Sequence, residues 1–197
     1  MQLDDIARAQ SLVGLFLARA DEQGDKPFLT ARTGGQWQSI TYSEAARQVC
    51  LMAERLVALG LNPGDRVIIV AENRPEWAIA DLAIMAAGCV TTPAYTTNTE
   101  GDHCHILDNS GARAVVVSTD KLARPLVAAM LRTGQAEHLV AIEPMANAQS
   151  GSFTIHQWAD MLAGDAAAAR AAVDARVAAV TRQDIACIIY TSGTSGA

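Results

Sequence analysis

A run of small and hydroxyl-bearing residues follows an apolar segment near the end of the chain. Residues 185–190 are mostly apolar, and the run after them is Thr191, Ser192, Gly193, Thr194, Ser195 and Gly196. Glycine allows the backbone to turn with positive φ, so that successive N–H groups can converge on an anion. The hydroxyl groups add further donors. The run predicts a loop that binds phosphate groups, and the alternative interpretation is an ordinary Ser/Gly turn between two elements.

Two common nucleotide-binding motifs are excluded. The Walker motif needs a lysine directly after its last glycine, and no lysine follows Gly193 in this chain. The dinucleotide motif Gly-x-Gly-x-x-Gly does not follow any early strand. The sequence therefore argues against a kinase or GTPase of the Walker type and against a nicotinamide-dependent enzyme.

The elements that must position this loop alternate between strand and helix. Apolar runs bounded by turn residues predict strands, and apolar residues at helical spacing predict the helices between them. Residues 66–71 and 114–118 carry no polar alternation, which is typical of strands buried on both faces. The expected strands are 27–31, 37–42, 66–71, 89–92, 114–118, 138–142 and 185–190. The expected helices are an N-terminal one through Val13 and Ala20, one after Thr41, and then 74–87, 100–109, 120–132, 154–162 and 163–180.

This alternation predicts an α/β fold, with a mostly parallel sheet flanked by helices and joined by right-handed crossovers. Helix starts are expected where a capping residue precedes an apolar stripe, at Thr41 (with Glu44 three residues later), Asn73 and Thr154. We find no internal repeat and no interior linker, so residues 1–197 are expected to form one unit. The last strand carries the glycine-rich run at its carboxyl end, where open α/β sheets bind ligands.

Residues 190–196 resemble the Tyr-Thr-Ser-Gly-Thr-Thr-Gly signature of the adenylate-forming enzymes, the acyl-CoA synthetase superfamily. The stretches 64–67 (Gly-Asp-Arg-Val), 72–77 (Glu-Asn-Arg-Pro-Glu-Trp) and 93–95 (Pro-Ala-Tyr) are similar to that family too. The 72–77 stretch looks most like the long-chain fatty-acid–CoA ligase branch. Ser195 stands where the family more often has threonine, which keeps the hydroxyl. The resemblance extends over nearly the whole chain.

The resemblance implies ATP-dependent activation of a carboxylic acid, a fatty acid by preference, to an acyl-adenylate and then to an acyl-CoA. ATP, Mg²⁺ and coenzyme A are the implied cofactors, residues 191–196 would bind the phosphates, and Thr191 would help to hold the metal. The family's adenine pocket, ribose-binding and magnesium-binding carboxylates and catalytic lysine would lie beyond Ala197. We therefore expect residues 1–197 to be the N-terminal portion of the AMP-binding large domain, with no catalytic residue and no activity of its own. The alternatives are a ligase for an aryl, short-chain or amino acid, and a non-catalytic α/β interaction module.

Composition limits the partners. Hydrophobic residues make up 50% of the chain and charged residues 18%, which is typical of a globular protein. The net charge of −6 argues against a nucleic-acid-binding surface. The longest apolar run, residues 82–90, is too short to span a membrane, while peripheral membrane contact is left open. We expect a cytoplasmic protein with small-molecule partners.

Several other residues could carry chemistry, and a structural role is favoured for each. His103, Cys104 and His105 suggest a metal site but lack a partner pair at zinc spacing, so a polar helix face is expected. Cys50, Cys89 and Cys187 lie in apolar segments and are expected to be reduced core residues. The tryptophans at 37, 77 and 158 are expected to pack in the core or at its rim. Capping and a surface ion pair are the favoured roles for Glu72, Asn73 and Arg74.

Overall fold

Five short strands pair in parallel to form the central sheet. The computed structural model describes residues 9–145 and 152–191. The strands are β3 (Arg66–Val70), β4 (Val90–Pro93), β5 (Ala114–Val117), β6 (His138–Ala141) and β7 (Thr154–Gln157), in the order β4-β3-β5-β6-β7. Every pair is parallel, as the strand–helix alternation predicts. Strand β3 lies between β4 and β5 and is buried along most of its length.

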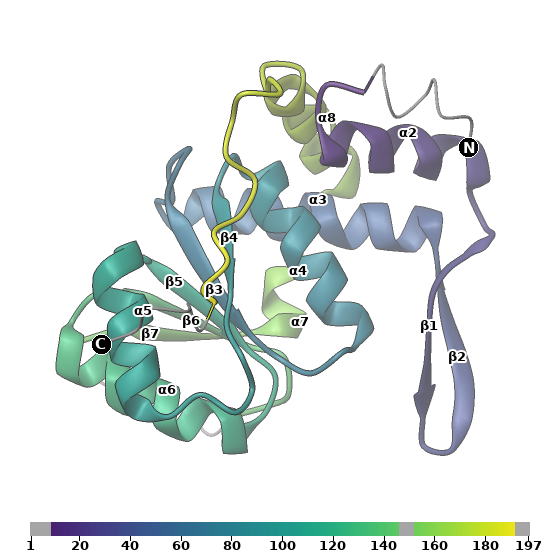
Figure 1. Cartoon of the computed structure of the whole chain (residues 1–197). Helices are drawn as coiled ribbons and strands as arrows, with labels where there is room; N and C mark the ends of the chain where they lie inside the picture. Colours follow the sequence, from purple (N-terminus) through teal and green to yellow (C-terminus); the bar gives the residue numbers. More distant parts are fainter. Residues whose placement is uncertain (1–8, 146–151, 192–197) are drawn as a thin grey trace.

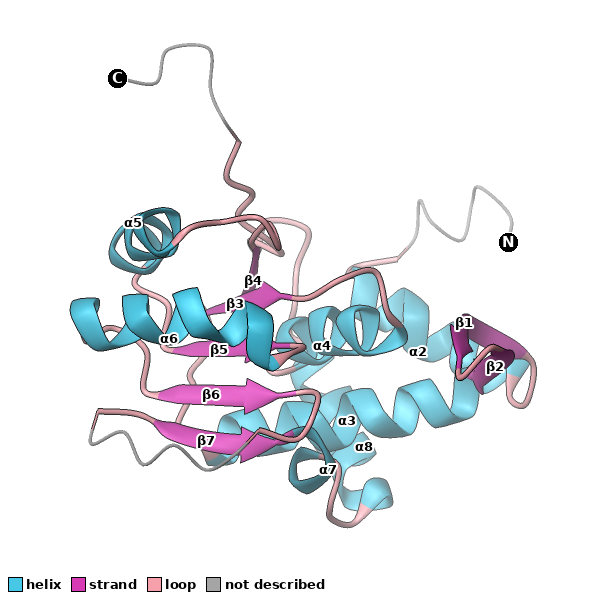
Figure 2. Cartoon of the chain, turned by 90° about the horizontal axis from the view of Figure 1, so that it is seen from below, coloured by secondary structure: helices cyan, strands magenta, loops and turns pink. Residues whose placement is uncertain are grey.

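Helices cover both faces of this sheet (Figures 1 and 2). On one face lie α2 (Leu12–Gln23), α3 (Tyr42–Ala58), α4 (Pro75–Ala86) and α8 (Ala166–Val177), whose buried side chains join Val67 and Ile69 of β3. On the other face lie α5 (Glu100–Ser110) and α6 (Asp120–Thr133), which pack against Ile68 and Val70. A single turn, α7 (Trp158–Met161), follows β7. The alternation of side chains along β3 thus divides the core into two layers.

A two-stranded hairpin stands apart from the sheet (Figure 1). It consists of β1 (Pro27–Thr33) and β2 (Gln36–Thr41), which pair antiparallel. Gly34 and Gly35 both have positive φ, the conformation that a two-residue hairpin turn requires. The sequence correctly predicts the hairpin but not the environment of its tryptophan, because Trp37 is 73% exposed on the open face of the hairpin.

One of the three expected helix starts is confirmed. The Thr41 side chain accepts a hydrogen bond from the Glu44 backbone N–H at 3.2 Å, and α3 begins there. The expected cap at Asn73 is wrong, because the N-cap of α4 is Arg74, which makes no side-chain capping bond. The cap at Thr154 is also wrong. Thr154 instead begins β7, because the edge of β6 is available for pairing and places Thr154 opposite His138.

The direction of the connections reverses at β3. The chain passes from β3 to β4 on one side and then crosses to β5 on the other, so the carboxyl ends of β3 and β5 meet at a topological switch point. Glu72 follows β3 and Ser118 follows β5, and the Ser118 hydroxyl donates a hydrogen bond to the Glu72 carboxylate. This hydrogen bond is the main cause that lowers the pKa of Glu72.

We expect Ile69→Ala to lower the free energy of unfolding by about 2–5 kcal/mol. Ile69 is completely buried in the interior strand β3, so the change leaves a cavity between β3 and the helix layer that contains α3 and α4. The measurement is urea denaturation followed by circular dichroism. Trp37→Ala in the exposed hairpin is the control and should change the stability by less than about 0.5 kcal/mol. Equal effects of the two changes would contradict the core assignment.

We also expect Ser118→Ala to raise the pKa of Glu72, because the carboxylate loses the donor that favours its charged form. Since the folded-state pKa of Glu72 is depressed, its contribution to stability exists above the ordinary carboxyl pKa and is lost as the pH falls through the lowered value. NMR titration of the glutamate side chains measures the shift. Glu44, whose pKa is held low by Arg47, provides the internal control and should not move.

Candidate functional site

Residues 185–190, the edge segment, precede the glycine-rich run and join the sheet beside β4. Cys187 forms an isolated parallel bridge with Thr91. The Thr91 N–H donates to the Ala186 carbonyl at 3.1 Å, and the Ile188 N–H donates to the Thr91 carbonyl at 2.9 Å. The expected last strand is therefore reduced to one bridge, parallel as predicted, on the outer side of β4.

This segment is exposed, and the prediction of a buried strand is wrong. Ile185 is 66% exposed and Ile189 is 64% exposed. Cys187 is exposed as well, so its assignment to the core is also wrong. The reason is its position at the edge of the sheet: within residues 9–145 and 152–191, β4 is its only strand partner. The apolar composition of residues 185–190 does not distinguish a central strand from an edge strand.

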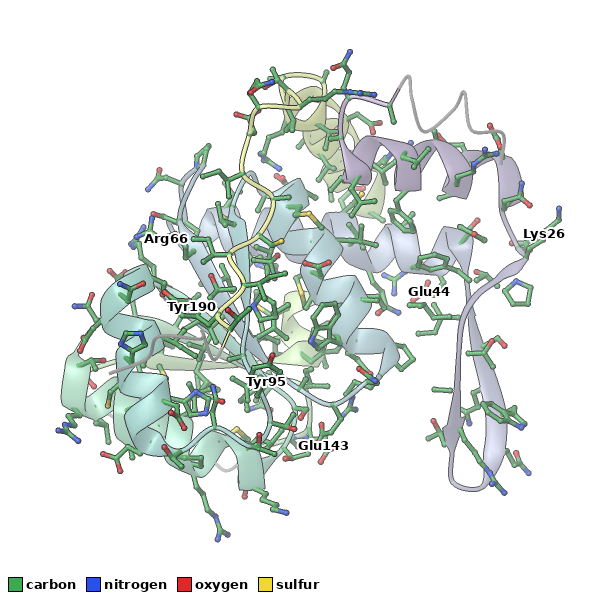
Figure 3. All side chains as sticks on the ribbon, in the orientation of Figure 1. Lys26, Glu44, Arg66, Tyr95, Glu143 and Tyr190 are labelled. Atoms are coloured by element: carbon green, nitrogen blue, oxygen red, sulfur yellow. The ribbon has the colours of Figure 1, made fainter. Side chains whose placement is uncertain are left out.

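Tyr190 is the last apolar residue before the run, and it contacts α5. Its hydroxyl donates a hydrogen bond to Oδ1 of Asn109 at 2.7 Å. Its ring meets the ring of His105 edge-on, with the centroids 6.0 Å apart and an interplanar angle of 83°. Partial burial raises the pKa of the Tyr190 phenol. Figure 3 shows Tyr190 beside the α5 ribbon and on the same side of the molecule as Arg66.

Thr191 follows directly and is exposed. It is the one predicted phosphate-binding residue within the described part of the chain. The other five, Ser192, Gly193, Thr194, Ser195 and Gly196, lie outside the described residues. The phosphate-binding role of the run therefore stays a prediction from sequence.

The charge of Arg74, the residue that precedes α4, is neutralised by neighbouring carboxylates. Arg74 donates from Nε to Glu76 and from a terminal nitrogen to Glu143, both at 2.9 Å. The surface ion pair expected for Arg74 is thus confirmed. Hydrogen bonds to these two carboxylates raise the pKa of Arg74, so the guanidinium remains charged. Because both carboxylates compensate that charge, Arg74 does not form an anion site of its own.

Three buried polar atoms in the described residues lack a hydrogen-bond partner. They are Oγ1 of Thr91, Oγ1 of Thr92 and Nδ1 of His103. The expected polar helix face is therefore wrong for His103, which is 1% exposed and whose pKa is lowered by burial. No group of three metal-ligating side chains occurs in residues 9–145 and 152–191. Thr91 and Thr92 are adjacent in β4, so their side chains point to opposite faces of the sheet and do not form one polar site.

A groove of about 1170 Å³ lies along the edge segment. Its wall is formed by the start of α2, by the end of α4, by the amino ends of β3 and β4 and by residues 176–188. Leu12, Met85, Val90, Ile185 and Ile188 are among the apolar side chains that line it. Sequence reasoning did not reveal this groove, because its walls come from segments far apart in the chain.

The remaining expectations concern packing. Cys50 and Cys89 are buried as predicted, and burial raises the pKa of both thiols to about 11, so they are protonated at neutral pH. Trp77 and Trp158 pack against the core. In the described residues, no helix has the length and apolar character needed to cross a bilayer.

The family of AMP-binding enzymes matches residues 16–197. The chain is 38% identical over 162 residues to the long-chain-fatty-acid–CoA ligase FadD15 of Mycobacterium tuberculosis. This match covers 82% of this chain and 26% of the relative. It is 34% identical over 157 residues to the 3-[(3aS,4S,7aS)-7a-methyl-1,5-dioxo-octahydro-1H-inden-4-yl]propanoyl:CoA ligase of the same organism, covering 80% of this chain and 30% of the relative. The chain thus spans between a quarter and a third of the length of these relatives.

A solved structure, the benzoate CoA ligase of Burkholderia xenovorans LB400, shares the fold. The TM-score is 0.64 at 24% identity, and the match covers 76% of this chain and 27% of that one. This likeness confirms the mostly parallel sheet flanked by helices as the fold of an adenylate-forming ligase. The extent of the family match and the identity to FadD15 agree with the motifs at residues 64–77 and 190–196. The chain belongs to the family of AMP-binding enzymes.

Proposed function

We propose that the polypeptide carrying this chain joins a carboxylic acid to coenzyme A in two steps. The carboxylate attacks the α-phosphorus of ATP, which gives an acyl-adenylate and releases pyrophosphate. The thiol of coenzyme A then attacks the acyl carbon and displaces AMP. The observation that carries this proposal is the family match over residues 16–197. We further propose that residues 1–197 form the N-terminal portion of the large domain, since the matched residues cover only 26% and 30% of these two relatives.

This chemistry asks the protein for positioning and for stabilisation of charge, because the carboxylate is already a nucleophile. We assign the β- and γ-phosphates, which leave as pyrophosphate, to Thr191, Ser192, Gly193, Thr194, Ser195 and Gly196. Backbone N–H groups and hydroxyls of this loop would donate to the phosphate oxygens. The charge that develops on the leaving pyrophosphate would thereby be stabilised before it departs.

The described residues fit a magnesium ion in part. The Thr191 hydroxyl is exposed, and a hydroxyl oxygen is a hard ligand of the kind that Mg²⁺ prefers. Magnesium would neutralise charge on the triphosphate when bound. Thr191 would supply one hard oxygen ligand, and phosphate oxygens and water would supply others. No residue of this chain is assigned to coenzyme A or to the adenine ring.

We infer a fatty acid as the substrate class, because FadD15, at 38% identity, is named a long-chain-fatty-acid–CoA ligase. An acid attached to a fused-ring ketone is the second candidate, because the relative at 34% identity is named a ligase of such an acid. Carboxylate-dependent ATP–pyrophosphate exchange, measured with fatty, aryl, short-chain and fused-ring acids in turn, distinguishes these classes. Exchange with none of them would favour the non-catalytic interaction module. A cytoplasmic location belongs to the proposal as well.

In the full polypeptide, we expect Thr191→Ala combined with Thr194→Ala to lower ATP–pyrophosphate exchange by about a hundredfold, because preorganised donors to the leaving group are lost. The control is Thr30→Ala combined with Ser39→Ala. It removes two exposed hydroxyls of the hairpin, which hydrogen-bond to each other at 2.8 Å. This control should leave exchange unchanged. Exchange that survives the loop changes would remove the role assigned to residues 191–196.

We expect the chain of 197 residues by itself to bind ATP weakly or undetectably and to catalyse no exchange. A phosphate loop without partners for the adenine and the metal does not offset the loss of translational and rotational freedom on binding. Isothermal titration calorimetry with ATP and Mg²⁺ is the measurement. Saturable binding in the micromolar range would contradict this assignment and show that residues 1–197 already contain a complete nucleotide site.

A further inference from the structure

We infer that helix α5 fixes the start of the phosphate loop through Tyr190, with Asn109 and His105 as positioning residues. The inference rests on the proposed function, because it concerns the loop that would bind the leaving pyrophosphate. It assigns a role to an exposed face of α5 that neither the sequence motifs nor the family match single out.

Tyr190 makes the described side-chain contacts that lie nearest to the glycine-rich run. It directly precedes Thr191, and adjacent Cα atoms are about 3.8 Å apart, so the position of Tyr190 limits where the loop can begin. Upstream, the edge segment is joined to the sheet by the single bridge between Cys187 and Thr91. Ile189, which lies between that bridge and Tyr190, is 64% exposed. The side chain of Tyr190 is therefore the contact that holds the chain immediately before the loop.

The contact is specific because it uses both parts of the tyrosine. His105 and Asn109 are four residues apart in α5 and so lie on one face of the helix. The phenol hydroxyl donates to Oδ1 of Asn109 at 2.7 Å, while the ring edge meets His105 at 6.0 Å between centroids. The contact with His105 thus fixes the orientation of the ring, and the hydrogen bond to Asn109 fixes the position of the hydroxyl relative to α5.

Helix α5 is itself held at both ends. At its start, Thr99 and Asp102 form a reciprocal capping box. At its end, Gly111 adopts the left-handed conformation. The Arg66 guanidinium, at the start of β3, donates to the carbonyls of Ser110 and Gly111, the latter at 3.1 Å. A cation at this position also interacts favourably with the helix dipole. The contacts therefore link the interior strand β3 to Tyr190 through α5.

The first test measures the position of the segment in the chain itself. Amide hydrogen exchange should show that Asn109→Ala and Tyr190→Phe each raise the exchange rate of the two hydrogen-bonded amides of the bridge, those of Ile188 and Thr91, by about threefold to tenfold, the size expected for one neutral hydrogen bond. Alanine favours helix, so Asn109→Ala leaves α5 intact. Asp108→Ala, an exposed change on the same turn, is the matched control and should have no effect.

The double variant distinguishes a direct contact from two separate effects. If Tyr190 and Asn109 act through one hydrogen bond, the double variant exchanges no faster than either single variant. Additive effects, or no effect of either change, would overturn the inference. His105→Leu removes the edge-on ring contact and is expected to raise the exchange rate of the same amides.

The second test measures the consequence for catalysis in the full polypeptide. Tyr190→Phe and Asn109→Ala should raise the KM for ATP by about threefold to tenfold and leave the KM for the acid unchanged, whereas Asp108→Ala should change neither. Faster amide exchange with an unchanged KM for ATP would overturn the positioning role. If the unmodified polypeptide shows no ATP–pyrophosphate exchange with any acid, the proposed function fails, and the hydrogen-exchange test still decides whether α5 fixes the edge segment.

Discussion

The pairing of β3 with two neighbours is the constraint on which the rest of the structure depends. Its backbone groups bond to β4 on one side and to β5 on the other, and its side chains alternate between the two helix layers. A strand in this position must be apolar on both faces, and Val67, Ile68, Ile69 and Val70 meet that requirement. Every feature of the candidate site is placed relative to this strand, because both the switch point and the attachment of α5 begin at its ends.

The two ends of β3 have different roles. At its carboxyl end, Glu72 and Ser118 join the two halves of the sheet where the connections diverge. At its amino end, Arg66 binds the last carbonyls of α5 and so fixes the helix that contacts Tyr190. Strand β3 thereby supports the edge segment indirectly, through α5. An edge segment held by one backbone bridge needs such side-chain support to present a loop in a defined place.

The edge segment is exposed, and an apolar groove lies along it. Both features agree with a chain that matches only part of the length of its relatives. It matches about a quarter of the length of FadD15. In our proposal this chain supplies the sheet and the phosphate loop, and the groups that bind adenine, acid and thiol belong to other parts of the polypeptide.

The sequence by itself determined the alternation of strands and helices, the parallel sheet, the hairpin and the family, because these depend on local periodicity and on motifs of adjacent residues. It also located the glycine-rich run. Tertiary structure decided what local patterns cannot encode. Thr154 entered a strand instead of capping a helix because β6 offered it a partner, and Cys187 became exposed because its strand lies at the edge. The contact of Tyr190 with Asn109 joins residues 81 positions apart, and only folding brings them within hydrogen-bond distance.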